Sequence, residues 1–133
     1  MNCLLDTSTL IWALTDRERL SFAARDFIFD SDVLKHVSVI SFYEIAIKIS
    51  IGKLKLHGIP AGDLPRIVYD LGVEMIVLEP FETISLSKLP LKDNHRDPFD
   101  RMLICQAIRR NLTLIGNDKK FAQYREHGLS LIW

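Results

Sequence analysis

The sequence predicts an α/β fold, a three-layer α/β/α sandwich with a central, mostly parallel five-stranded sheet. Short apolar segments of strand character alternate along the chain with longer segments of helical periodicity. This alternation favours parallel pairing, because each helix carries the chain back to the edge of the sheet where the previous strand began. The 133 residues suffice for one hydrophobic core. We therefore expect a single domain over residues 1–133.

The individual elements follow from apolar periodicity and from helix start and stop signals. Strands are expected at residues 3–5, around residues 37–40 (Val37, Val39 and Ile40), and at residues 73–78, 112–115 and 129–132. Helices are expected at residues 7–14, 21–30, 41–52, 63–71, 81–88 and 119–125, with a longer, regular one that begins at Asp97-Pro98. Proline in the first turn is typical of a helix start.

The composition is that of a globular protein without a dominant charge. Hydrophobic residues make up 48%, and Lys plus Arg balance Asp plus Glu at 17 each. This balance argues against strong, indiscriminate attraction to nucleic acid but permits a local basic rim. Cys3 and Cys105 lie in apolar segments and are expected as buried thiols in a reducing compartment. Asp6 and Asp16 interrupt the first apolar stretch, so we expect no signal peptide, no membrane span and a cytoplasmic location.

Four acidic residues, Asp6, Glu44, Asp100 and Asp118, each lie where a predicted strand passes into a predicted helix. In a parallel sheet such junctions gather at the carboxyl edge of the strands, where ligands bind. Carboxylates brought together there repel one another unless a cation neutralises them. Hard oxygen ligands suit Mg²⁺ or Mn²⁺, ions that bind phosphates and activate water. The four positions together predict a metal site for phosphodiester hydrolysis.

Each of these acids also has a purely structural interpretation. Asp6 and Asp118 precede predicted helices and can cap them. The Ser-x-x-Glu pattern that ends at Glu44 fits a capping box, which explains this residue without a metal. Asp97 is a good cap for its helix, which leaves Asp100 less fully explained. Single acids can thus be caps, whereas the coincidence of four at one edge favours the metal site.

Other polar residues give weaker signals. The histidines show no metal-ligand spacing and are expected on the solvated surface: His36, His57, His95 and His127. Lys48 and Arg101 can form ion pairs within their helices, worth about 0.3–0.5 kcal/mol, or contact a substrate phosphate. A rim that positions phosphates without reading sequence can be formed by Lys53, Lys55, Arg96 and Lys119.

The motifs around the four acids resemble those of the PIN-domain family, and most of all the VapC-type toxins of bacterial toxin–antitoxin pairs. The resemblance covers essentially the whole chain and depends on motifs in combination. These are Leu4-Leu5-Asp6-Thr7-Ser8, Ser41-x-x-Glu44-Ile45-Ala46-Ile47-Lys48, Gly52-Lys53-Leu54, His95-Arg96-Asp97-Pro98-Phe99-Asp100-Arg101, Ile104-x-Gln106-Ala107 and Asp118-x-x-Phe121.

The resemblance implies a PIN-like fold and a Mg²⁺- or Mn²⁺-dependent endoribonuclease that acts on RNA. Asp6, Glu44 and Asp100 would be the catalytic, metal-binding acids, with Asp118 as a fourth that supports a second ion or the water. It further implies a homodimer and a small cognate antitoxin that occludes the site. One position departs from the pattern, because relatives often have Thr where this chain has Gly116.

Two other functions fit parts of the same pattern. A catalytically silent PIN-like module that binds RNA or protein would share the fold, but it would have no need of all four acids. A structure-specific DNA nuclease would use the same acids, but the chain lacks insertions for clamping a branched duplex. A metal-dependent endoribonuclease, the toxin of a toxin–antitoxin pair, is therefore the function that the sequence favours.

Overall fold

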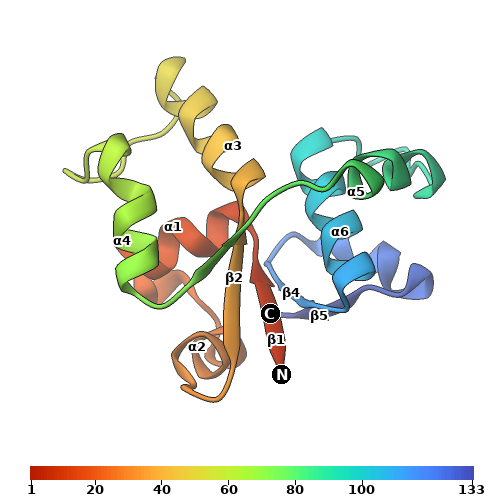
Figure 1. Cartoon of the computed structure of the whole chain (residues 1–133), viewed down its shortest axis with the longest axis horizontal. Coiled ribbons are helices and arrows are strands. Elements are labelled where there is room, and N and C mark those ends of the chain that lie inside the picture. Colours follow the sequence, from red (N-terminus) through yellow and green to blue (C-terminus); the bar gives the residue numbers. More distant parts are fainter.

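The computed structural model describes all residues, 1–133, and contains a five-stranded sheet with helices on both faces (Figure 1). The strands are β1 (Asn2–Leu5), β2 (Leu34–Ser38), β3 (Glu74–Ile76), β4 (Thr113–Ile115) and β5 (Ser130–Ile132). The α-helices are α1 (Thr7–Thr15), α2 (Phe22–Phe29), α3 (Val39–Ser50), α4 (Leu64–Asp70), α5 (Pro80–Ser85) and α6 (Pro98–Arg110). Four 3₁₀ helices complete the chain: η1 (Arg17–Arg19), η2 (Ala61–Asp63), η3 (Leu86–Lys88) and η4 (Lys119–His127).

The sheet is entirely parallel, in the order β3-β2-β1-β4-β5. The central strand β1 pairs with β2 on one side and with β4 on the other, so that Leu4 lies between His36 and Leu114. The strand order therefore reverses at β1, which makes the carboxyl ends of β1 and β4 the switch point where α/β proteins bind ligands. The predicted parallel sheet is confirmed.

Side chains of alternate strand residues enter two separate hydrophobic cores, as expected for a sheet buried on both faces. Cys3 and Leu5 pack into the core formed with α1, α2 and α4, whereas Leu4 packs into the core formed with α6 and η4. Figure 1 shows α1, α2 and α4 on one side of the sheet and α5 and α6 on the other. The three-layer sandwich is confirmed, and both cysteine thiols are buried as expected.

The main difference from the predicted elements lies between β2 and α3. Val39 and Ile40 were expected in a strand and instead form the first turn of α3. The helix begins here because the Ser38 hydroxyl accepts a hydrogen bond from the Ile40 amide and so caps the helix. A good cap thus outweighs the strand preference of two β-branched residues.

The remaining elements lie where the sequence placed them, with small shifts of their ends. The third strand is shorter than residues 73–78, and the helix expected at residues 119–125 is the 3₁₀ helix η4. None of the helices combines the length and the apolarity that crossing a bilayer requires.

Candidate metal centre

Acidic side chains from separate parts of the chain line one small hollow of about 250 Å³ at the switch point of the sheet. We call this hollow the acidic pocket. Its lining consists of Asp6, Thr7, Ser8, Glu44, Lys48, Asp97, Asp100, Asn117, Asp118 and Phe121. All four predicted site residues are therefore brought together. Asp6 and Asp118 follow β1 and β4, whereas Glu44 lies in the second turn of α3 and Asp100 in the first turn of α6.

Asp6 caps α1 and is almost completely buried. Its Oδ1 accepts a hydrogen bond of 2.7 Å from the Thr9 amide, and its own amide donates to the Ile115 carbonyl at 3.0 Å. Burial, together with the nearby Asp100 and Glu44 carboxylates, raises the pKa of Asp6 to about 7 despite the hydrogen bonds from Thr9, which lower it. The cap predicted for Asp6 is therefore confirmed. Apart from the hydrogen bond of this cap, no cationic side chain pairs with the Asp6 carboxylate.

Gly116 explains how Asp6 fits at this crowded position. A Cβ atom at residue 116 would lie 2.6 Å from Asp6 Oδ2 and 2.7 Å from a ring carbon of Phe121, both closer than such atoms approach in proteins. The space that a side chain at residue 116 would need is thus filled by the Asp6 carboxylate and the Phe121 ring. Glycine is the residue that permits this close approach of β4 to the acid.

Glu44 is held by side chains rather than by a helix cap. The Thr7 hydroxyl donates to Glu44 Oε1 at 2.6 Å, and Lys48 Nζ lies 2.6 Å from Glu44 Oε2, one helical turn further along α3. The predicted capping box with Ser41 is wrong, because the cap of α3 is Ser38 and Ser41 lies inside the helix. Glu44 is therefore available to the acidic pocket, while the ion pair predicted for Lys48 is confirmed.

Asp100 receives a hydrogen bond from a buried histidine that the sequence placed on the surface. His95 is 2% exposed, its Nε2 lies 3.1 Å from Asp100 Oδ2, and its Nδ1 lies 3.0 Å from the Tyr124 hydroxyl. Arg101 Nη1 in turn donates to the Tyr124 oxygen at 3.4 Å. Because Arg101 only donates, the tautomer that satisfies every group has Tyr124 donate to Nδ1 and Nε2–H donate to Asp100.

This donor chain (Arg101, Tyr124, His95 and Asp100) fixes one oxygen of Asp100. The His95 ring lies edge-on to the rings of Phe121 and Tyr124, with centroids 5.7 and 5.5 Å away. Burial raises the pKa of Asp100, the His95 hydrogen bond lowers it, and the neighbouring Asp97 raises it again. Side chains that bind a metal are usually oriented by such a hydrogen bond to a second residue. Here His95 holds Asp100 through Oδ2.

Arg101 has neither of the roles that the sequence offered for it. It is buried, and its guanidinium donates to the carbonyls of Leu89 and Pro90 at 3.0 Å each. It therefore faces the segment before α6 and forms no ion pair within its helix. His36 is also buried, with Nδ1 2.9 Å from the Cys3 carbonyl, so the surface position expected for it is wrong. His95 is the functional candidate that sequence reasoning missed, although it is the first residue of the motif that ends at Arg101.

Asp97 and Asp118 cap helices at the rim of the acidic pocket. Asp97 accepts from the Asp100 amide at 2.9 Å, and Asp118 accepts from the Lys120 amide at 2.9 Å, so both predicted caps are confirmed. Each cap uses one carboxylate oxygen, Oδ1, and leaves the second oxygen without a hydrogen bond within the chain. A capping role is therefore compatible with a ligand role at Asp118.

The spacing of the ligand atoms is suitable for a cation. One ligand atom each from His95, Asp100 and Asp118 lies within 4.8 Å of the other two. Asp6 and Glu44 line the same pocket outside this closest group. Since His95 Nε2 already donates to Asp100, the oxygen ligands left to the pocket are those of the carboxylates, which is the donor set that Mg²⁺ and Mn²⁺ prefer.

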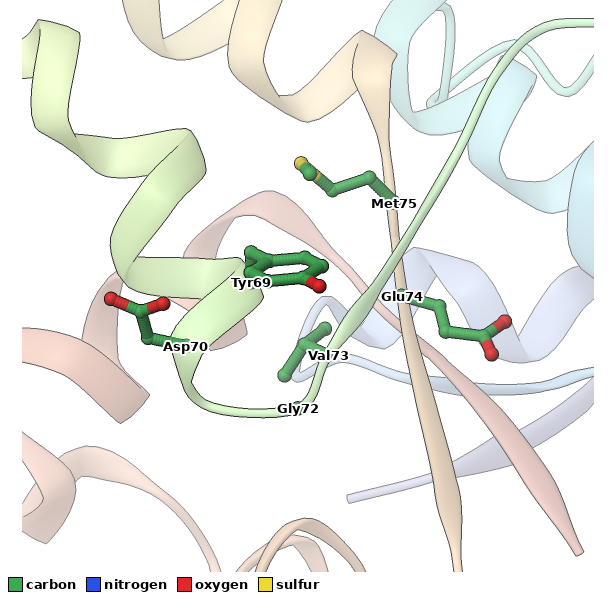
Figure 2. A pocket seen from close by; sticks show the side chains of 6 residues that line it. All are labelled: Tyr69, Asp70, Gly72, Val73, Glu74 and Met75. Atoms are coloured by element: carbon green, nitrogen blue, oxygen red, sulfur yellow. The ribbon is translucent and has the colours of Figure 1, made fainter.

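A larger hollow of about 730 Å³ lies elsewhere, between α4 and β3, and its chemistry is different. It is lined by Tyr69, Asp70, Gly72, Val73, Glu74 and Met75. Figure 2 shows that the carboxylates of Asp70 and Glu74 point away from each other, so they do not converge on a common ion. The gathering of carboxylates is specific to the acidic pocket.

The fold and the acidic pocket define an α/β protein with a carboxylate-lined centre at the switch point of its sheet. The sequence pattern of the PIN domain family matches residues 3–127. The chain belongs to this family. A comparison with curated proteins finds no match.

Solved structures of three bacterial complexes share the fold. VapBC2 from Rickettsia felis, bound to a DNA fragment from its promoter, aligns with a TM-score of 0.71 and 20% identity over 99% of this chain and 98% of that chain. VapBC-5 from Mycobacterium tuberculosis, of the VapBC family of toxin–antitoxin systems, gives 0.63 and 15% over 98% and 97%. VapBC-1 from nontypeable Haemophilus influenzae gives 0.61 and 20% over 99% and 97%.

Proposed function

We propose that the chain is a Mg²⁺- or Mn²⁺-dependent endoribonuclease that hydrolyses RNA phosphodiester bonds and acts as the toxin of a toxin–antitoxin pair. The observation that carries this proposal is the convergence of Asp6, Glu44, Asp100 and Asp118 in one pocket of about 250 Å³. PIN domains are in general nucleases, and the similar structures are of VapBC toxin–antitoxin proteins. Both findings support hydrolysis of a nucleic acid.

The residues of the acidic pocket fit a divalent cation. Asp6 is buried and negatively charged when ionised, yet no cation of the chain lies within ion-pairing distance of it. Its raised pKa expresses this lack of a counter-charge. An external cation held by Asp6, Glu44, Asp100 and Asp118 would supply the charge. Bound there, such an ion lowers the pKa of water and offsets the negative charge of a phosphodiester.

The chain's own side chains hold the ligands in position. Thr7 and Lys48 fix the two oxygens of Glu44, and His95 fixes one oxygen of Asp100. Lys48 is the one cation in the lining of the acidic pocket, so it can contact a phosphate oxygen of the substrate. These contacts reduce the freedom of the carboxylates before the substrate binds, which is how a site gains from preorganisation.

We propose that the chain binds two protein partners, a small antitoxin and a second copy of itself. Two apolar surfaces favour this proposal. Phe81 and Ile84 on α5 are 78% and 72% exposed. On the other side of the sheet, a largely apolar hollow of about 220 Å³ includes Phe29 of α2 and Leu71, the residue after α4. Large exposed apolar side chains that gather in this way mark interaction surfaces.

The direct test of the proposed activity is RNA cleavage by Asp6→Asn and Asp100→Asn with Mg²⁺, with Mn²⁺ and with EDTA. We expect each variant to lose at least about 100-fold in rate, because each removes a charged ligand, and wild type to be inactive in EDTA. Asp70→Asn is the matched control, since this acid lies in the other hollow. Folded variants that cut RNA as fast as wild type would refute the metal-dependent mechanism.

Two further measurements are needed. One tests whether the substrate is RNA or DNA, and the other tests the role as a toxin. Wild-type protein is offered RNA and DNA of the same sequence side by side, and we expect cleavage of the RNA. Expression in a bacterial host should arrest growth, and Asp100→Asn should relieve the arrest. Purified protein that cleaves no RNA and arrests no growth would instead indicate a silent binding module.

A further inference from the structure

A second hollow, rich in basic residues, adjoins the acidic pocket. It has a volume of about 400 Å³ and is lined by Thr7, Ser8, Ile11, Trp12, Thr15, Asp16, Arg19, Lys48, Lys53, Leu54, Lys55 and His57. We call it the basic hollow. Thr7, Ser8 and Lys48 belong to the lining of both, so the two hollows are continuous along the start of α1 and one face of α3.

Three cations of the basic hollow lack acidic partners, whereas Lys48 pairs with Glu44. Arg19, Lys53 and Lys55 take part in no ion pair, and Asp16 is the one acid in the lining. Lys53 and Lys55 are exposed and make no side-chain hydrogen bond. In a chain whose charges balance overall, three unpaired cations thus lie beside the pocket that gathers five carboxylates.

Arg19 is held in place by aromatic rings. Its guanidinium carbon lies 4.5 Å from the centre of the Trp12 ring, and Trp12 packs against Trp133 with ring centres 5.8 Å apart. A guanidinium on a partly buried indole retains its charge and its donors for a further ligand. The hollow therefore presents one oriented cation, Arg19, beside the exposed Lys53 and Lys55.

These cations all lie on one side of the acidic pocket. The only Lys or Arg in the lining of the acidic pocket is Lys48, which is also the residue shared with the basic hollow. Of the rim expected from the sequence, Lys53 and Lys55 belong to the hollow, whereas Arg96 and Lys119 are outside both linings and Arg96 pairs with Asp93. The cations that line the two hollows thus offer counter-charges to a polyanion on the side of the basic hollow.

We propose that the basic hollow binds the backbone phosphates of single-stranded RNA on one side of the bond to be cut. This inference rests on the proposed function, because it takes RNA as the substrate of the acidic pocket. Arg19, Lys53 and Lys55 contact phosphates, which positions the strand without selecting its bases. Nucleotides on that side of the scissile phosphate contribute to binding, and those on the other side contribute little.

The first experiment measures binding of a fluorescein-labelled single-stranded RNA of mixed sequence by anisotropy, in EDTA, at several NaCl concentrations. The variant is Lys53→Gln/Lys55→Gln. The control is Lys88→Gln/Arg109→Gln, which removes two cations from a hollow that shares no residue with the acidic pocket. The slope of the logarithm of the binding constant against the logarithm of the salt concentration is negative. Loss of two phosphate contacts should make it less steep by about 1.4 for single-stranded RNA, and the control should keep the wild-type slope.

The second experiment locates the contact along the strand. Once the cleavage position on an RNA is mapped with Mg²⁺, the substrate is shortened from its 5′ side or from its 3′ side. For wild type we expect KM to rise on shortening one side only, and for Lys53→Gln/Lys55→Gln we expect that rise to disappear. Circular dichroism verifies that both variants are folded.

The outcomes separate this inference from the proposed function. If wild type cleaves RNA but the variant has the wild-type salt slope and the same length dependence, the basic hollow does not bind the strand and this inference fails alone. If wild type cleaves no RNA, the proposed function fails, whatever the slopes are. Equal rises in KM on shortening either side would also overturn the one-sided placement.

Discussion

Glu82 and Asp6 are both carboxylates with little exposed surface, 4% and 5%, that lie in opposite electrostatic surroundings. For Glu82, burial acts to raise the pKa, but hydrogen bonds from Arg110, the Glu79 amide and Gln106 outweigh it, so its pKa lies below the usual range. For Asp6, burial and, to a lesser degree, the neighbouring carboxylates raise the pKa to about 7 despite the hydrogen bonds from Thr9. One acid is compensated within the chain, and the other is not.

This difference separates a structural carboxylate from a functional one. Glu82 holds α5 against α6 through its ion pair with Arg110, and it also forms a capping box with Glu79 at the start of α5. Asp6 accepts a hydrogen bond from the Thr9 amide as the cap of α1, but it pairs with no cation. A fold gains nothing from an uncompensated buried charge, so the missing counter-charge at Asp6 is expected from outside the chain. Exposed surface alone does not distinguish the two acids.

The largest effect on stability is expected when the compensated acid is neutralised. Glu82→Gln leaves Arg110 without its carboxylate, and the free energy of unfolding should fall by about 2 kcal/mol, below the usual range for buried pairs because Arg110 is partly exposed. Urea denaturation in EDTA measures this loss, with the exposed acid Glu18→Gln as the control. RNA cleavage by the folded variant should stay at the wild-type rate. If the folded Glu82→Gln variant lost RNA cleavage, the assignment of Glu82 as structural and Asp6 as functional would be wrong.

The opposite sign is expected at Asp6. The native pKa of about 7 lies above the value of an unfolded aspartate. Between about pH 4 and pH 7 the native state therefore keeps a proton that the unfolded chain has released, and the metal-free protein loses stability as pH rises through this window. Asp6→Asn retains an oxygen for the Thr9 amide and removes the charge. At pH 8 in EDTA it should be more stable than wild type by about 1–2 kcal/mol.

The same pair of proteins tests the need for an external cation. Addition of Mg²⁺ at pH 8 should raise the melting temperature of wild type, because binding to the native state stabilises it. Asp6→Asn should respond much less. If Asp6→Asn were less stable than wild type in EDTA and its pH profile were unchanged, Asp6 would be a compensated acid like Glu82.

The sequence predicted the acids whose neighbours are close along the chain. Asp6, Asp97 and Asp118 each accept from an amide two or three residues ahead, so a local pattern is sufficient to place them. The parallel pairing of the strands also follows from the local alternation of strand and helix segments. The caps at these acids and the parallel sheet were therefore correctly predicted, whereas the role of the acids as metal ligands stays a prediction.

The parts that failed depend on contacts across the chain or on two competing local signals. His95 reaches Tyr124 across 29 positions, and no spacing rule for histidine includes a tyrosine so far away. Glu44 accepts from Thr7 across 37 positions, which no pattern around Ser41 reveals. At the start of α3, the Ser-x-x-Glu pattern pointed to Ser41 as the cap, whereas the Ser38 hydroxyl accepts from the Ile40 amide and caps the helix three residues earlier.

Asp100 is intermediate between Glu82 and Asp6, because the group that stabilises its charge is a neutral hydrogen-bond donor, His95. A change to this donor is expected to have the smallest effect. Tyr124→Phe removes the hydroxyl 3.0 Å from His95 Nδ1 and keeps the ring that packs against His95. Without that partner the tautomer that donates to Asp100 is no longer fixed. We expect the Mg²⁺ concentration for half-maximal cleavage to rise about 10-fold, with KM for RNA unchanged. Tyr69→Phe removes an exposed hydroxyl elsewhere and should alter neither value. A Tyr124→Phe protein that needed no more Mg²⁺ than wild type would show that His95 orients Asp100 without the hydroxyl, and that packing between the rings of Phe121 and Tyr124 is sufficient.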